Sequence, residues 1–251
     1  MAKMTLIAMV QDVLNDMDSE DVNSLADSTE EALQVASIIR TTYYEIINSR
    51  YWPHLRDIGT LDAYADSDYP VHFRVAENVQ TLEWLKYNSR SVTDTKDKYL
   101  DLDYMEPKDF IDYLNLRDSS KSNVRSVTDI SGTTLLILND TAPTKWSSFD
   151  DEIIIMDAYD SAVDTTLQQS KLQAQTYREP TFSITDAFIP DLPGKAFPYL
   201  LSESKSVAFN ALRQVGNQKE EQRSRRQRTW LAREKGTVYD STKAQNWGRK
   251  R

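Results

Sequence analysis

The period of the apolar residues changes twice along this chain, and this change constrains its fold more than any other feature. From Leu6 to Met17 the apolar residues recur at helical spacing behind Thr5, a residue type favoured at a helix N-cap. A second helix is predicted from the capping box Ser28–Glu31 to about Arg50, and Pro53 ends it. Two amphipathic helices of this size cannot bury their own apolar stripes, so this segment requires another helix as a partner.

The middle of the chain, from about Leu55 to Pro190, instead contains short apolar runs typical of strands. A short helix is predicted from Pro107 to Arg117, with Phe110, Tyr113 and Leu114 on its inner face. Ser131-Gly132 predicts a hairpin turn. The predicted strands cover residues 71–74, 79–87, 99–104, 126–130, 133–138 and 152–156.

The helical period returns after the turn at Asp191–Gly194. Its apolar stripe contains Phe197, Leu200, Leu201, Ser204, Val207, Ala208, Ala211, Leu212 and Val215. We therefore predict an α+β fold: an antiparallel helical bundle of N- and C-terminal helices, with an inserted β-rich domain and an extended C-terminal arm. The predicted divisions are residues 1–54 for the helical hairpin, 55–190 for the β-rich domain, 191–218 for the last bundle helix and 219–251 for the arm.

The composition excludes several classes of enzyme. With no cysteine, the chain has no disulfide, no thiolate zinc ligand and no cysteine nucleophile. Its two histidines offer little material for a histidine-rich metal site or a Ser-His-Asp triad, and its six glycines are too dispersed for a phosphate-binding loop. We therefore predict no catalytic, cofactor-binding or metal site, and no enzymatic activity.

Two acidic clusters and the two histidines are the remaining candidates for chemistry. Asp150-Asp151-Glu152 precedes an apolar strand, and Asp101 and Asp103 fall on one face of another strand. Paired carboxylates can bind a divalent metal or share acid–base work. In a chain with 39 acids, however, the simpler interpretation is that these carboxylates are solvated or form turns. We expect His54 to pack or cap at a helix end, and His72 to be a strand residue.

No segment predicts contact with a membrane. Residues Met1–Val10 are typical of an amphipathic helix and lack the long apolar stretch of a signal peptide. No run approaches eighteen consecutive apolar residues, so we expect no membrane-spanning helix.

The net charge of −9 hides an uneven distribution. Residues 219–251 hold eleven Lys/Arg and four Asp/Glu, a net of +7, which leaves 19 bases and 35 acids, a net of −16, in the preceding 218 residues. A basic terminal segment is often solvated and disordered, and it can also bind nucleic acid. The third interpretation is a protein-docking arm, because Trp230, Tyr239 and Trp247 alternate with arginines, and these residue types are enriched at interface hot spots.

Three segments together resemble a known family, the head-to-tail adaptors of short-tailed bacteriophages, which are also called tail-tubular-protein-A-like head–tail connectors. The first is the opening segment from Leu6 to Arg56, with Val22-Asn23-Ser24 in an acidic link and the exit Trp52-Pro53. The second is the DLPGKAFPYLLSESKSVAFNAL helix, and the third is the basic, aromatic C-terminus that ends in NWGRKR.

The resemblance implies a structural subunit of the virion, assembled in the host cytoplasm and located at the head–tail interface. Such adaptors form rings of twelve copies on the portal protein, carry the tail nozzle or tail tube protein and in some cases fibres, and extend a channel through which genomic DNA passes without specific binding. In this family the C-terminal arm binds the portal. Carried onto this sequence, the portal-binding residues are Arg225, Arg226, Arg228, Trp230, Tyr239, Trp247 and Arg249.

Two alternatives stay open. The chain is consistent with another neck or head-completion component that contacts the adaptor rather than the portal. It is also consistent with a nucleic-acid-binding protein that uses its basic C-terminal segment, in which case binding to DNA should weaken strongly with salt.

Overall fold

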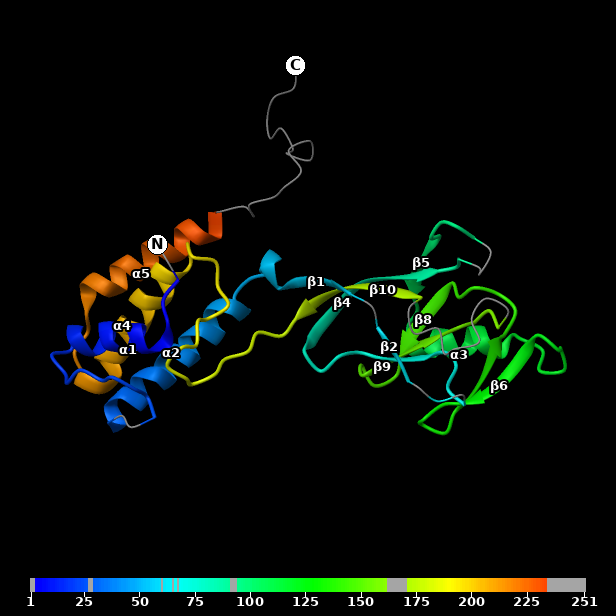
Figure 1. Ribbon diagram of the computed structural model, residues 1–251, viewed down its shortest axis with the longest axis horizontal. Coiled ribbons are helices and arrows are strands. Elements are labelled where there is room, and N and C mark those ends of the chain that lie inside the picture. The colour runs from blue at the N-terminus through cyan, green and yellow to red at the C-terminus, as the bar shows by residue number, and fades with distance from the viewer. Residues whose placement is uncertain are drawn as a thin grey trace, which may run out of the picture. The chain divides into compact units, whose positions relative to one another are not determined.

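The computed structural model of the chain consists of two compact units. The first, here called the helical unit, comprises the described parts of Met1–His54 and Pro180–Arg251, and the second, the sheet unit, comprises the described parts of Leu55–Glu179 (Figure 1). The structure describes residues 3–26, 29–59, 61–64, 66, 68–90, 94–161 and 171–233.

The helical unit contains α1 (Leu6–Asp16), α2 (Glu30–Asn48), α4 (Phe197–Arg213) and α5 (Gln218–Arg233). The predicted N-cap of the first helix is confirmed, since the Thr5 hydroxyl accepts a hydrogen bond from the Ala8 amide at 3.4 Å. At α2 the cap is Thr29, whose hydroxyl accepts from the Ala32 amide, while Ser28 of the predicted capping box lies outside the described residues. The 3-10 turn Pro53–Leu55 follows α2.

Helix α4 is joined to α1 by a buried cation. The Lys205 side chain is 8 % exposed, and its Nζ pairs with Asp12 at 2.8 Å and with Asp16 at 2.6 Å. The two carboxylates are one turn apart on α1, so one ammonium group reaches both. Their hydrogen bonds and charge raise the pKa of Lys205 against the opposing effect of its burial. The N-terminal hairpin and the later helix are thus held together by charge as well as by apolar contact.

An extended segment before α4 closes the N-terminal end of α1. The Leu6 amide donates to the Phe188 carbonyl at 2.7 Å, which satisfies a first-turn N–H that has no partner inside the helix. The Asp186 carboxylate accepts from the Leu25 amide at 2.7 Å, and the Phe182 ring lies 5.4 Å from the ring of Tyr43. Residues 180–190, placed by the sequence pattern with the β-rich middle, therefore pack in the helical unit.

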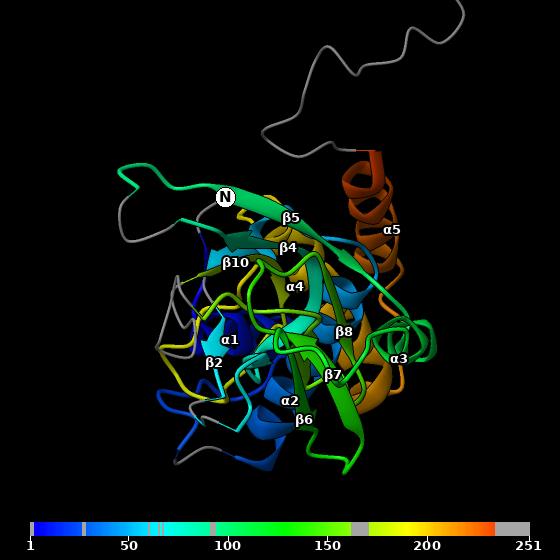
Figure 2. The ribbon, with the colours of Figure 1, turned by 90° about the vertical axis from the view of Figure 1, so that its right-hand side faces the viewer.

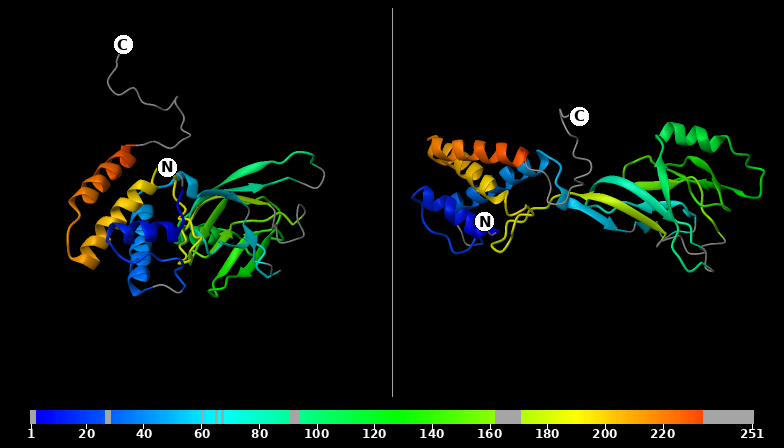
Figure 3. Two further views of the ribbon diagram at one scale, coloured as in Figure 1. Left: turned by 60° about the vertical axis from the view of Figure 1, so that its left-hand side comes forward. Right: turned by 90° about the horizontal axis from the view of Figure 1, so that it is seen from above.

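After α4 the described chain turns back on that helix. α4 ends at Arg213, where Gln214 adopts a left-handed conformation with φ 55°. After Asn217 the chain enters α5, which lies alongside α4 (Figures 1 and 3). One face of α5 buries Glu220, Ser224 and Leu231. The described part of the predicted extended arm is therefore a packed helix.

The sheet unit contains an eight-stranded mixed sheet in the order β1-β10-β4-β5-β8-β9-β3-β2, and a separate hairpin of β6 and β7. Neighbouring strands are antiparallel except for the parallel pair β5 and β8; β4 lies beside β5 in Figure 2. The strands are β1 (Arg56–Gly59), β2 (Asp62–Ala63), β3 (His72–Arg74), β4 (Val79–Asn88), β5 (Tyr99–Tyr104), β6 (Val124–Thr128), β7 (Thr134–Leu138), β8 (Lys145–Ser148), β9 (Ile153–Met156) and β10 (Leu172–Arg178).

The sheet unit has a hydrophobic core of its own. Phe73, Tyr87 and Ile137 are fully buried in it, together with Phe110 from α3 (Pro107–Asn115). The predicted short helix is confirmed, with Phe110 and Leu114 as its buried residues. The predicted hairpin turn is confirmed as well: Gly132 has φ 84°, a left-handed conformation that glycine adopts without strain.

The predicted fold class is wrong. The structure is not a helical bundle with an inserted domain and an extended arm: in the described residues five helices accompany the large curled mixed sheet and the two-stranded sheet. The sheet unit has its own core, and the predicted arm is helical as far as Arg233. Apolar periodicity located the segments, but how segments combine depends on long-range pairing that a local pattern does not contain.

No helix within the described ranges is both long enough and apolar enough to cross a membrane.

Candidate interaction surface on helix α5

Helix α5 packs against the rest of the helical unit through a narrow stripe of buried residues. The Ser224 hydroxyl donates to the Glu203 carboxylate of α4, and the Arg50 guanidinium donates to the Leu231 carbonyl at 2.5 Å. Glu220, Ser224 and Leu231 lie on one face because they are separated by four and seven residues. The remaining two flanks of the helix are exposed.

The first flank borders an open groove of about 680 Å³ beside the start of α4. The residues that α5 contributes recur at helical spacing, so they form a single row along the helix. Trp230, at 51 % exposure, lies at the end of that row. The groove is lined by Gly194, Lys195, Pro198, Lys219, Gln222, Arg223, Arg226, Gln227 and Trp230.

The groove carries more positive charge than its surroundings neutralise. Arg223 pairs with Glu220 of the buried stripe at 3.5 Å. Among the described residues, no ion pair or hydrogen bond engages the side chains of Lys219 or Arg226. Four cationic side chains, an aromatic ring and the Pro198 ring therefore share one concave surface. Such a surface suits an acidic protein segment that also offers apolar contact.

The second flank carries Arg225 and Arg228, and it is closer to electrical neutrality. Arg225 pairs with Glu221 one turn earlier at 2.5 Å. Arg228 faces Tyr199 of α4: burial and the nearby Glu203 raise the pKa of the Tyr199 hydroxyl, and the charge of Arg228 opposes this rise. This flank is the open side of α5 away from the groove.

The predicted portal-binding residues thus do not form one surface. Arg226 and Trp230 lie together in the groove, whereas Arg225 and Arg228 lie on the second flank. Lys195, Pro198, Lys219 and Arg223 also line the groove and were not among the predicted residues. Positions 219, 223, 226 and 230 have the spacing of one helix face, which is the sequence signal for this row. Tyr239, Trp247 and Arg249 lie outside the described residues.

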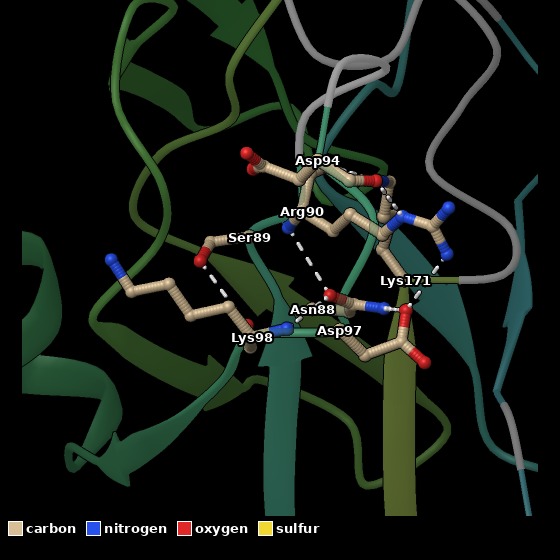
Figure 4. Close-up of polar contacts among 7 residues, drawn as sticks. All are labelled: Asn88, Ser89, Arg90, Asp94, Asp97, Lys98 and Lys171. Atoms are coloured by element: carbon tan, nitrogen blue, oxygen red, sulfur yellow. Dashed lines mark hydrogen bonds and ion pairs between the residues drawn. The ribbon is translucent and has the colours of Figure 1, made fainter.

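The acidic clusters considered for catalysis have structural partners. The Asp150 carboxylate accepts from the amides of Glu152 at 3.0 Å and Ile153 at 2.8 Å, which confirms its interpretation as a turn-forming residue, and Asp151 has φ 63°. Asp101 pairs with Lys86, and Asp103 pairs with Lys145. At the β4–β5 hairpin, Asn88, Arg90 and Asp97 bond to one another and to neighbouring backbone groups (Figure 4). We assign these contacts a structural role.

The two histidines lie in different units. His54 bonds through Nε2 to the Asp191 carbonyl oxygen at 2.9 Å, beside the ring of Trp52, as expected for a packing residue at a helix end. His72 lies on β3, as predicted, and its Nε2 is 2.9 Å from Oδ1 of Asp129. The Ser131 amide donates to the other oxygen of Asp129. In this row the aspartate lies between the serine and the histidine, so it does not form a nucleophilic triad.

The burial of His72 makes the stability of the sheet unit depend on pH. Burial lowers the pKa of His72 from its usual value of 6.5, against the opposing effect of Asp129. The unfolded chain therefore binds a proton as the pH falls through about 6.5, while the folded chain resists it, so the free energy of unfolding falls below that pH. We expect the melting temperature to be lower at about pH 5.5 than at about pH 7.5. His72→Gln should show a weaker dependence over this range, and an equal dependence would contradict the assignment.

No group of three or more His, Asp or Glu residues that could hold a metal ion occurs among the described residues. Comparison of the chain with protein-family models and with curated protein sequences gives no match. The proposed function therefore depends on the residues and their geometry, and within the described ranges we consider the groove beside α5 as a binding surface.

Proposed function

We propose that this chain is a non-enzymatic structural protein of a short-tailed bacteriophage, a head-to-tail adaptor that forms the twelve-copy ring of that family on the portal protein. In this proposal the chain resides at the head–tail interface of the virion, contacts the tail nozzle or tail tube protein and in some particles fibres, and surrounds a channel for genomic DNA without binding it specifically.

The exposure of α5 on two flanks is the observation that carries this proposal. A helix held by a narrow stripe, with arginines on both sides and Trp230 half exposed, suits a subunit that contacts two protein neighbours at once. We propose that Arg225 and Arg228, with Tyr239, Trp247 and Arg249 further along the chain, contact the portal. Arg226 and Trp230 lie on the groove side, and we propose that they contact another protein of the assembled particle.

The packing of α5 determines how the proposal is best tested. Removal of residues 219–251 would expose the face of α4 that α5 covers, and would therefore disturb folding as well as binding. Removal of residues 234–251 leaves α5 and its buried stripe in place. The truncation should thus separate docking from stability.

We expect the chain lacking residues 234–251 to keep its melting temperature and to lose at least tenfold in affinity for the portal protein of the same phage, because several anchor side chains are removed at once. The measurement is co-sedimentation with purified portal rings, with native mass spectrometry to count the copies bound. Arg225→Glu with Arg228→Glu should weaken binding further. Lys108→Glu with Lys121→Glu, at two exposed lysines of the sheet unit, is the matched double charge reversal. Unchanged portal binding by the truncated chain would refute the docking proposal.

The groove also supports one alternative, because cations beside a tryptophan can bind phosphates and stack on a base. If the chain is a nucleic-acid-binding protein, it should bind a single-stranded oligonucleotide with an affinity that falls steeply with salt, and Trp230→Ala should weaken that binding. The net charge of −16 in the first 218 residues opposes this alternative.

A further inference from the structure

A second unsatisfied charged surface lies elsewhere on the helical unit, and it has the opposite sign to the groove. The link between α1 and α2 exposes Asp18, Glu20 and Asp21 within four residues. No ion pair among the described residues engages any of these three carboxylates. In a single copy, therefore, the cations Lys219 and Arg226 of the groove and the acids of the link all face solvent.

The link is held in a fixed shape. Val22 and Leu25 are buried beneath it. The Gln11 side-chain amide donates to the Val22 carbonyl at 2.6 Å, and Arg213 of α4 donates to the Met17 carbonyl at 3.1 Å. Asp18 has φ 54°, which places it at a sharp turn. The three acids are thus presented by an anchored segment, so less conformational entropy is lost when they bind a partner.

We propose that the groove on α5 of one copy binds the acidic link, Asp18–Asp21, of a second copy of this chain. The two surfaces are complementary in charge: the groove offers Lys195, Lys219, Arg223 and Arg226, and the link offers three carboxylates. Trp230 and Pro198 supply the apolar contact at one end. Complementary charges of this kind contribute more to the register and to the choice of partner than to the affinity of the contact.

The geometry of such a contact fits a ring. Groove and link are different surfaces of the same unit, so the contact is heterologous. A pair of copies joined by one such contact keeps a free link on one copy and a free groove on the other, and each can bind a further copy. Heterologous contacts close into rings when the rotation between copies allows it. The inference rests on the proposed ring, and it adds the two surfaces that join neighbouring copies.

The absence of cysteine from the sequence makes a direct test possible. One chain carries Arg226→Cys and another carries Glu20→Cys, and the two are mixed at equal concentration under mild oxidation. A disulfide forms readily only where the two Cα atoms approach within about 7 Å. We expect at least tenfold more disulfide-linked heterodimer from this pair than from Arg225→Cys mixed with Glu20→Cys, since Arg225 lies on the other flank of the same helix. Equal yields from the two pairs would overturn the proposal.

Charge reversal provides a second measurement that does not depend on cross-linking. Sedimentation equilibrium should show self-association that weakens at least fivefold with Arg226→Glu or with Glu20→Lys alone. The association should recover in an equimolar mixture of these two variants, or in a chain that carries both substitutions. The association should also weaken with salt, because the charges lie at the protein surface. Self-association unaffected by either reversal would count against the groove.

These outcomes are distinct from failure of the proposed function. Loss of the selective cross-link with intact portal binding refutes the contact between copies alone. A selective cross-link in a chain that does not bind portal leaves the contact between copies standing and refutes portal docking. An oligonucleotide that occupies the groove and blocks the Arg226→Cys reaction would overturn the proposal in favour of nucleic-acid binding.

Discussion

Replacing Trp52 by alanine is expected to lower the free energy of unfolding of the helical unit by about 3–5 kcal/mol. Trp52 is 1 % exposed and is among the largest fully buried side chains of the protein. The Arg50 guanidinium lies 4.1 Å from the centroid of its ring, and the His54 ring lies 5.8 Å away. The substitution removes the buried area, leaves a cavity and separates the cation from its aromatic partner.

The measurement is chemical denaturation followed by circular dichroism, which does not require tryptophan fluorescence. Trp52→Phe keeps most of the apolar volume and should cost clearly less. Trp230→Ala is the matched control on the same unit, because Trp230 is 51 % exposed and its loss should change stability by no more than about 0.5 kcal/mol. A loss with Trp52→Ala as small as that with Trp230→Ala would show that Trp52 is not part of the core.

The second large effect is expected at Asp157 in the sheet unit, where replacement by alanine should cost about 3–5 kcal/mol. The Asp157 side chain is 3 % exposed and pairs with the Arg117 guanidinium, itself 10 % exposed, at 3.1 Å. It also accepts from the amides of Thr144 and Lys145, each at 2.9 Å. Its loss would leave the buried Arg117 cation without its counter-charge and two amide donors without their acceptor.

Asp103→Ala is the matched control for this prediction. Asp103 also pairs with a cation, Lys145 at 2.7 Å, but its side chain is 72 % exposed, so its removal should cost less than about 1 kcal/mol. Both variants are compared by urea denaturation of the full chain. Equal costs for the two aspartates would show that burial does not determine the strength of these pairs.

The local structure of the chain follows closely from local residue patterns. Thr5 caps α1 through a hydrogen bond within its own first turn, and Gly132 permits the left-handed conformation of the β6–β7 hairpin. The apolar spacing around Phe110 and Leu114 predicts α3. These features depend on interactions among residues close in sequence, which is why the sequence alone predicts them.

The long-range contacts could not be predicted in the same way. Asp157 and Arg117 are 40 residues apart, and nothing in the sequence distinguishes that aspartate from the other acids. The groove combines Lys195 and Pro198 with residues of α5, which meet because α5 turns back on α4 after Gln214. The apolar stripe fades at Gly216-Asn217, so the pattern favoured an arm where the structure has a packed helix.

The sequence by itself determined helices α1 to α4 and strands β3, β4, β5, β6, β7 and β9, although not β1, β2, β8 or β10. It also determined the separation of charge between the first 218 residues and the last 33. Only the tertiary structure decided which of those charges remain available. Burial against α4 removes one face of α5 from solvent and divides its arginines between two flanks, because side chains that are neighbours in sequence point in different directions around a helix. The same folding leaves Lys219 and Arg226 exposed in a groove and leaves three carboxylates exposed on an anchored link, because an ion pair depends on distance in space and not on distance along the chain.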